Sequence, residues 1–338
     1  MSVIIPTILF FVGLVCVIKG ADWLTDGAAN IAEMYGIPTI VVGLTIVAVG
    51  SSAPEFVVSV VSAINGNNDM AIGNVVGSNI FNILGIIGLT ALVRPIQAER
   101  ANIRYDIPFM VLANVVVAIT IYDTLLDPDN ATGDYISRTD GLLMLCMFAI
   151  FMSYTMSIAN NAGKQRGVAQ QTATSEGAEI SQTKSGKGLW KSIALVVIGL
   201  AVLVFGGDWL VDGASGIASV IGISDSIIAL TIVSAGTSAP ELAASVMAAK
   251  KGDTAMAVGN IVGSVVFNVF FVLGTSATIT PLGVGNITPF DIYTLLGSSV
   301  LMWVLCRFGK TRFTLTRFEG LIMVLLVIAY YAVLVFRA

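Results

Sequence analysis

Two glutamates stand in apolar stretches long enough to cross a membrane. Glu55 follows Gly-Ser-Ser-Ala-Pro at 50–54, and Glu241 follows Gly-Thr-Ser-Ala-Pro at 236–240. A carboxylate at the centre of a bilayer costs at least ~2.5 kcal/mol unless a polar cavity or a partner receives it. A single such glutamate could simply join two helices or stay protonated in a polar interface. Its repetition in an equivalent setting favours a functional site.

Hydroxyl and carbonyl oxygens accompany each glutamate. The hydroxyls lie three and four positions before it, on the same face of a helix, and belong to Ser51, Ser52, Thr237 and Ser238. The proline before each glutamate has no N–H, so the carbonyl four positions earlier, at Gly50 or Gly236, loses its helical partner. Within lipid such a carbonyl needs another partner, and a bound cation is one.

A second polar motif lies in the next apolar stretch of each copy. It reads Gly-Asn-x-x-Gly-Ser-x-x-Phe-Asn at 73–82 and again at 259–268. Its serine and asparagine share one helix face and are Ser78, Asn82, Ser264 and Asn268. The glycines allow close helix approach, and such serines and asparagines also hydrogen-bond between membrane helices. This motif alone therefore indicates packing as readily as chemistry.

The combined ligand set contains only oxygen, because the motifs carry no cysteine and the chain has no histidine. Ca²⁺ takes about 6–8 oxygen ligands in flexible geometry, whereas Mg²⁺ demands a tight octahedron and keeps its water. The set therefore favours Ca²⁺. Two ionised glutamates match the charge of one Ca²⁺ and also attract Na⁺, so competition for shared ligands is a physical route to antiport.

The composition places these motifs in an all-α integral membrane protein. Of the 338 residues, 56% are hydrophobic and only 11% are charged, too few for a soluble domain of this size. Stretches long enough to span a bilayer predict ten transmembrane helices. They lie near 3–22, 38–64, 70–93, 107–126, 141–160, 191–210, 224–249, 255–279, 289–306 and 318–336.

The chain contains two repeats, because each matched residue of the second copy lies 186 positions after its counterpart, as Glu241 follows Glu55. The polar stretch 161–190 has no apolar period and predicts a linker between repeats 1–160 and 191–338. Five spans per repeat make the second copy enter the membrane from the opposite side. Inverted repeats are typical of secondary transporters, with the site near the bilayer midplane where the repeats meet.

Lysine and arginine alternate between the connections. They follow the third, fifth, seventh and ninth predicted helices, whereas the fourth is followed by five aspartates and one arginine. Because cytoplasmic loops are rich in Lys and Arg, we expect both termini outside the cytoplasm and the linker 161–190 inside it. The N-terminus has no basic region and predicts a first membrane helix, not a signal peptide. The compact chain suits a prokaryotic cytoplasmic membrane.

The two pairs of motifs resemble the alpha-1 and alpha-2 repeats of sodium/calcium exchangers, within the cation/calcium antiporter superfamily. The resemblance covers alpha-1 at 38–93 and alpha-2 at 224–279. It implies that helices 2, 3, 7 and 8 enclose the site and that helices 1 and 6 slide as a gate. The ligands that it implies for Ca²⁺ and Na⁺ are Glu55, Glu241, Ser51, Ser52, Thr237, Ser238, Ser78, Asn82, Ser264 and Asn268, with backbone oxygens of Ala48 and Ser234.

Asn268 departs from several relatives, among them potassium-dependent exchangers, which carry an aspartate there. The asparagine removes one anionic ligand, so potassium co-transport is not expected. The linker 161–190 also lacks room for the large calcium-sensing domains of animal exchangers. Regulation of that type is not expected.

The sequence therefore predicts a Na⁺/Ca²⁺ antiporter that works by alternating access and is not an enzyme. Its expected partners are the lipid bilayer and the transported Ca²⁺ and Na⁺, without a cofactor, nucleic acid or protein partner. A Ca²⁺/H⁺ exchanger would use the same glutamates. A cation channel is less favoured because filters more often come from rings of similarly oriented elements. An enzyme would need a nucleophile or metal motif, and none accompanies the glutamates.

Overall fold

The structure of the protein is a computed structural model. It describes residues 4–98, 100, 102–122, 134–175, 186–220, 234–285, 287–309 and 313–337, without the side chains of 163–175, 186–187, 234–235 and 337. Eight helices in these ranges are long and apolar enough to cross a membrane, and a bent pair adds a ninth candidate span. The chain is therefore a mostly helical, multi-pass membrane protein.

Most elements of the first half have a counterpart at the same place in the described order of the second half. The first half consists of α1 (Ile4–Tyr35), α2 (Thr39–Val42), η1 (Gly43–Val47), α3 (Ala48–Ser51), α4 (Ala53–Ile64), α5 (Asn68–Ile80), η2 (Phe81–Ile86), α6 (Ile87–Val93), β1 (Ile96–Gln97), η3 (Asn102–Asp106), α7 (Ile107–Ile121), β2 (Tyr135–Ile136) and α9 (Arg138–Ser175). The second half consists of α10 (Gly186–Val220), α12 (Ser234–Thr237), α13 (Ala239–Lys250), α14 (Thr254–Val266), η5 (Phe267–Leu273), α15 (Gly274–Ile279), β3 (Leu282–Gly283), α16 (Pro289–Phe308), β4 (Thr314–Leu315) and α17 (Arg317–Arg337). The η elements are π-helical turns.

Two helical hairpins with the same turn carry the polar motifs. α4 joins α5, and α13 joins α14, through a glycine with positive φ, Gly66 at 77° and Gly252 at 94°, a conformation that glycine adopts without strain. The next residue, Asn67 or Asp253, caps the following helix by accepting a backbone N–H of its first turn. The local sequence therefore determines both hairpins.

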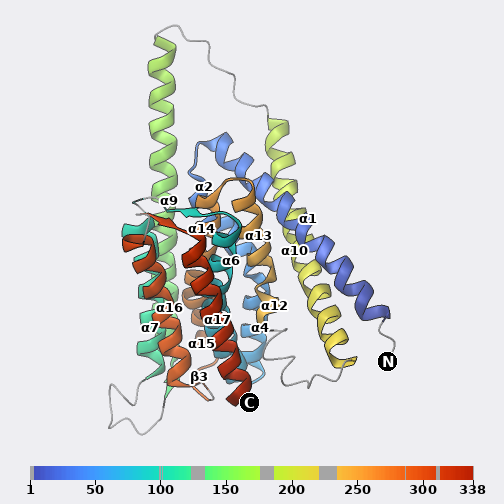
Figure 1. The fold of residues 1–338 in the computed structure, drawn as a ribbon. Coiled ribbons are helices and arrows are strands. Elements are labelled where there is room, and N and C mark those ends of the chain that lie inside the picture. The colour runs from blue at the N-terminus through green and yellow to red at the C-terminus, as the bar shows by residue number, and fades with distance from the viewer. Residues whose placement is uncertain are drawn as a thin grey trace.

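The helices of the second motif form the centre of the bundle. In the apolar, membrane-length part of Thr254–Ile279, 94% of the residues are buried. In the same part of Asn68–Val93, 78% of the residues are buried. The corresponding share for Ile4–Tyr35 is only 22%. Figure 1 shows α1 and α10 as a slanted pair at one side of the bundle. The polar residues of the second motif thus lie on the elements farthest from lipid.

A seam of glycines joins α1 to α10. The glycines recur every seventh residue on both helices, at Gly13, Gly20, Gly27, Gly199, Gly206 and Gly213. A Cβ atom on Gly20 would lie 2.6 Å from the backbone nitrogen of Leu203, and one on Gly199 would lie 2.7 Å from that of Leu24. The two backbones therefore approach each other closely along the glycine seam.

Two short strand pairs connect the halves of the chain. β1, after α6, pairs antiparallel with β4, which precedes α17. β3, after α15, pairs antiparallel with β2, which precedes α9. Each pair thus joins a segment of one half to a segment of the other.

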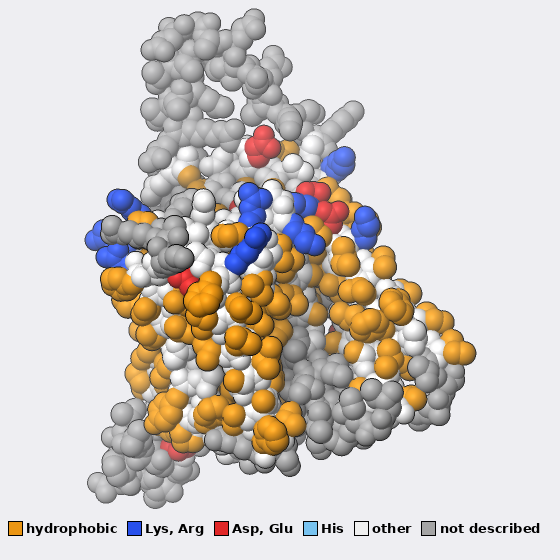
Figure 2. All heavy atoms as spheres, in the orientation of Figure 1, with side chains coloured by type: hydrophobic (Ala, Val, Ile, Leu, Met, Phe, Trp, Pro, Cys, Tyr) orange, Lys and Arg blue, Asp and Glu red, His pale blue; other side chains and the backbone are white. Residues whose placement is uncertain are grey.

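Lysine and arginine side chains gather in a band at one end of the apolar surface (Figure 2). Lys251, in the turn between α13 and α14, forms ion pairs with Asp22 at 2.7 Å and Asp26 at 2.8 Å. It also donates to the hydroxyl of Thr25 at 3.0 Å. These contacts hold α1 against the second hairpin. The counterpart of Lys251 in the first hairpin is Asn65, which cannot form an ion pair.

Several helices extend beyond their predicted ranges. α1 continues to Tyr35 beyond residue 22, and α10 begins at Gly186 and ends at Val220. α9 continues to Ser175, into the predicted linker 161–190. Hydropathy marks the stretch that lipid covers, whereas backbone hydrogen bonds continue the helix into polar sequence.

The number of spans agrees with the prediction only in part. The described ranges hold eight or nine of the ten predicted spans. The remaining one, at 224–249, falls partly on residues 221–233, which lie outside the described ranges, and is represented by α12 and α13.

The glycine seam leads to a prediction about stability. Gly20→Ala should lower the free energy of unfolding by about 1–3 kcal/mol, because its Cβ meets backbone that cannot move aside. Gly297→Ala in α16 is the matched control, since nothing lies within 4 Å of the added carbon. Thermal melting of the purified protein in detergent compares the two. Equal melting temperatures would contradict close backbone contact at the seam.

Candidate functional site

Each glutamate lies in the first turn of a helix that follows a break. The axis bends by 48° between Thr39–Ser51 and Ala53–Ile64, and the break falls at Ser52 (φ −83°, ψ 12°). Ser238 has nearly the same angles (φ −88°, ψ 10°) at the start of α13. A proline is the second residue of each helix, in the first turn, where its missing N–H costs no hydrogen bond. The partial positive charge of a helix N-terminus favours a carboxylate there.

The two copies meet through serine–glutamate hydrogen bonds. Ser52 Oγ donates to Glu241 Oε1 at 2.7 Å, and Ser238 Oγ donates to Glu55 Oε1 at 3.1 Å. All four side chains are fully buried. The serine of each copy thus holds one carboxylate oxygen of the other copy, which brings residues 186 positions apart into one site.

Two asparagines that the sequence analysis did not assign support the glutamate backbones. Asn74 Nδ2 donates to the backbone oxygen of Glu55 at 3.2 Å and to Ser59 Oγ at 2.9 Å. In the second copy, Asn260 makes the same two contacts with Glu241 and Ser245, at 3.3 and 2.8 Å. Both belong to the Gly-Asn pair of the second motif. The repetition of this pair in both copies could have identified them from the sequence.

The other predicted residues of the first motif lie beside the breaks. Ser51 Oγ contacts the backbone oxygen of Ala48 and Oδ1 of Asn260, both at 3.3 Å. Thr237 ends α12 and Ser234 begins it, and the side chain of Ser234 lies outside the description. Ala48 is fully buried at the start of α3. The oxygens of Ser51 and Ala48 therefore already have partners within the protein.

Both motifs contribute buried side-chain oxygens that lack hydrogen-bond partners. Within the described part of the chain, six predicted site residues carry a buried side-chain oxygen without a hydrogen-bond partner: Glu55 and Glu241 (each Oε2), Ser78, Ser264, Asn82 and Asn268. Unpaired buried polar atoms also occur on other helices, at Asn102 and Asn114 for example. Each such group costs about 1–3 kcal/mol. These six oxygens, at equivalent positions of the two copies, are of the kind that Ca²⁺ binds in proteins.

The last asparagine of the second motif lies in a π-helical turn in each copy, which the sequence did not predict. Asn82 is the second residue of η2, and Asn268 is the second residue of η5. η2 packs against α13 and α14, and η5 packs against α4 and α5. A π-helical turn interrupts the regular hydrogen-bond ladder and is frequent at functional sites. Each π-helical turn thus lies against the hairpin of the other copy.

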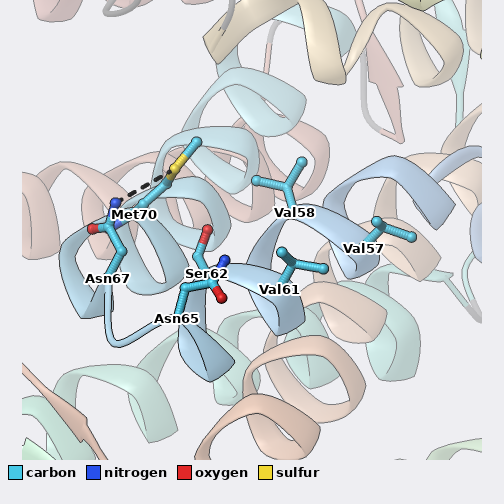
Figure 3. A pocket seen from close by; sticks show the side chains of 7 residues that line it. All are labelled: Val57, Val58, Val61, Ser62, Asn65, Asn67 and Met70. Carbon is cyan, nitrogen blue, oxygen red and sulfur yellow. Dashed lines mark hydrogen bonds between the residues drawn. The ribbon is translucent and has the colours of Figure 1, made fainter.

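A separate hollow is lined by residues of the first hairpin (Figure 3). Its volume is about 380 Å³, and its lining is Val57, Val58, Val61, Ser62, Asn65, Asn67 and Met70. None of the predicted site residues lines it. The hollow is therefore separate from the predicted site residues.

Comparison with known proteins gives a consistent family. The family described as sodium/calcium exchanger protein matches residues 5–157 and 191–336. The candidate antiporter CaxA of Alkalimonas amylolytica is 37% identical over 97% of this chain and 98% of its own. Inner membrane protein YrbG of Escherichia coli K12 is 34% identical over 90% and 89%. The sodium/calcium exchanger MaX1 of Methanosarcina acetivorans is 29% identical over 97% of both.

Solved structures give the same result. The sodium-calcium exchanger NCX_Mj, soaked with zero Na⁺ and Ca²⁺, superposes with a TM-score of 0.80 at 28% identity, covering 98% of this chain and 100% of that one. The same protein soaked with 2.5 mM Na⁺ and 0.1 mM Ca²⁺ gives a TM-score of 0.77.

The unequal hydrogen bonding of the site serines predicts different effects of their substitution on stability. Ser238→Ala should lower the free energy of unfolding by about 1–3 kcal/mol, because Glu55 loses a donor. Ser264→Ala removes an unpaired buried hydroxyl and should leave stability unchanged or higher. Thermal melting in a chelator and a sodium-free buffer measures both. If Ser264→Ala destabilised as much as Ser238→Ala, its hydroxyl would have a partner after all.

Proposed function

The chain belongs to the sodium/calcium exchanger family, whose members are cation antiporters, and we propose that it exchanges Na⁺ for Ca²⁺ by alternating access. The proposal rests on one observation above all. The two copies exchange serine–glutamate hydrogen bonds at Oε1 and leave Oε2 of both glutamates unpaired. Buried charges are normally paired or bound to a metal ion, so a cation would be a favourable partner for these two unpaired carboxylate oxygens.

Cation binding would use both motifs. The serine bonds orient each carboxylate, so that Glu55 and Glu241 direct their second oxygen to the ion. Ser78, Asn82, Ser264 and Asn268 would add hydroxyl and amide oxygens, and Ser51, Ser52, Thr237 and Ser238 would complete the set with backbone oxygens of Ala48 and Ser234. Ca²⁺ accepts such mixed sets of about 6–8 oxygens.

Charge couples the two ions. Two ionised glutamates in one water-poor site repel each other, and burial without compensation costs several kcal/mol per ion. One Ca²⁺ ion or several Na⁺ ions neutralise the two glutamates. The site can therefore close around bound cations, whereas closure of the empty site is unfavourable. Because both ions need the same glutamates, they bind in turn. This is the condition for antiport.

The transport mechanism also assigns roles to the helices. We propose ten spans in two inverted repeats, 1–160 and 191–338, with 161–190 as the connecting linker. α1 and α10 would slide as the gate. In support, the side chains of Leu200 and Val211 on α10 abut Gly50 and Gly236 beside the two helix breaks. Movement of α10 would therefore be felt at both glutamates.

The orientation in the membrane follows from charge. The band of Lys and Arg at one end (Figure 2) would face the cytoplasm, with the linker on that side and both termini on the other. The relatives of bacterial and archaeal origin support a prokaryotic cytoplasmic membrane.

The counter-ion is tested by Ca²⁺ uptake into proteoliposomes. An outward Na⁺ gradient should drive uptake, whereas an outward H⁺ gradient should not, and added K⁺ should change nothing because Asn268 offers no charge. Uptake driven by a pH gradient and indifferent to sodium would indicate a Ca²⁺/H⁺ exchanger. Uptake that needs neither gradient and carries current would indicate a channel.

The glutamates are tested one at a time. Glu55→Gln and Glu241→Gln should each abolish exchange, because the amide removes half of the charge that binds Ca²⁺, while the protein still inserts. Glu319→Gln is the matched control: this carboxylate is 5% exposed and accepts from Thr316 N–H at 2.7 Å, outside the site. It should retain exchange. Wild-type transport by either glutamine variant would remove that glutamate from the site.

A further inference from the structure

Within the second motif, the two copies differ in side-chain polarity at one buried position. Asn79 follows Ser78 in the first copy, and its counterpart in the second copy is Val265. Both side chains are fully buried. Asn79 Nδ2 donates to the backbone oxygen of Val265 at 3.4 Å, so the two counterparts touch each other where the repeats meet. Only one of them can form side-chain hydrogen bonds.

This difference reaches the amide ligands. Asn268 Nδ2 donates to Asn79 Oδ1 at 3.1 Å. The bond of Asn79 to Val265 turns its Oδ1 into the acceptor for this contact. The nitrogen and the oxygen of a carboxamide point in different directions, so Asn268 Oδ1 is turned away from Asn79, and it is buried without a partner.

The corresponding asparagine of the first copy has no such support. Both Nδ2 and Oδ1 of Asn82 lack a hydrogen-bond partner among the described residues. The position that would supply an acceptor by repeat symmetry is Val265, whose side chain has none. Asn82 can therefore turn either its oxygen or its nitrogen to the site, whereas Asn268 cannot.

We propose that Asn79 is a positioning residue that holds the amide of Asn268 with its oxygen directed to the transported cation. The inference rests on the proposed cation site and deepens it. A cation needs an oxygen, and an N–H turned toward it repels it. Fixing the amide removes the unfavourable orientation before the ion arrives. The second copy thereby supplies a preorganised neutral ligand, and the first copy an adjustable one.

The first test removes the acceptor. Asn79→Val should raise the Ca²⁺ concentration that gives half-maximal uptake by roughly three- to ten-fold, the loss of one hydrogen bond, with a much smaller change in the maximal rate. The same shift should appear in the Ca²⁺ concentration that raises the melting temperature in detergent. An unshifted concentration in both measurements, with wild-type exchange intact, would overturn the inference.

A double-mutant cycle separates positioning from packing. In Asn268→Asp both terminal atoms are oxygens, so orientation no longer matters, and Asn79→Val should then have no further effect on half-maximal Ca²⁺. An equal loss in both backgrounds would show that Asn79 acts only through packing.

A gain-of-function variant keeps the inference testable if Asn79→Val does not fold. Val265→Asn supplies Asn82 with the missing acceptor and should lower half-maximal Ca²⁺ a few-fold. A weaker or unchanged affinity would contradict the inference. Failure of the proposed function is a different result, because the wild-type protein would then show no gradient-driven uptake, while Ca²⁺-dependent melting would still report the amide.

Discussion

The constraint on which the rest of the structure depends is the burial of two carboxylates in one membrane protein. Neither Glu55 nor Glu241 reaches solvent, and each uncompensated charge in such a place is costly. The helix N-termini favour each carboxylate, and the serine donors satisfy one oxygen of each. They leave the other oxygen to be satisfied by something that the chain itself does not supply. The same buried carboxylates thus affect both the stability of the protein and its proposed cation binding.

Much of the candidate site could be predicted from the sequence because the same polar motifs occur in both repeats. An isolated glutamate in an apolar stretch is ambiguous, but an identical neighbourhood at a constant spacing predicts that the two meet. The structure brings Ser52 to Glu241 and Ser238 to Glu55. The apolar spans were predicted for a similar reason, since lipid imposes a length and a composition that few other segments share.

The remaining features depend on geometry that composition does not encode. The π-helical turns at Phe81 and Phe267 arise from local winding of the helix, and no residue type marks them. The hydrogen bond between Asn268 and Asn79 requires knowing which faces of two remote helices meet. The predicted ends of α1 and α9 were too early, because hydropathy detects only the part of a helix that lipid covers.

The glycine seam between α1 and α10 determines how close the two helices lie, but not how far one is shifted along the other. Its glycines recur every seventh residue on both helices, so a shift by one heptad, about 10 Å along the axis, would again set glycine against backbone. The seam fixes the distance between the helices but allows more than one position along the helix axis. That position is set by other contacts, namely Lys251 with Asp22 and Asp26, and side chains of α10 against Gly50 and Gly236. Damage to the seam would loosen the pair, whereas damage to the other contacts would leave it intact but misplaced.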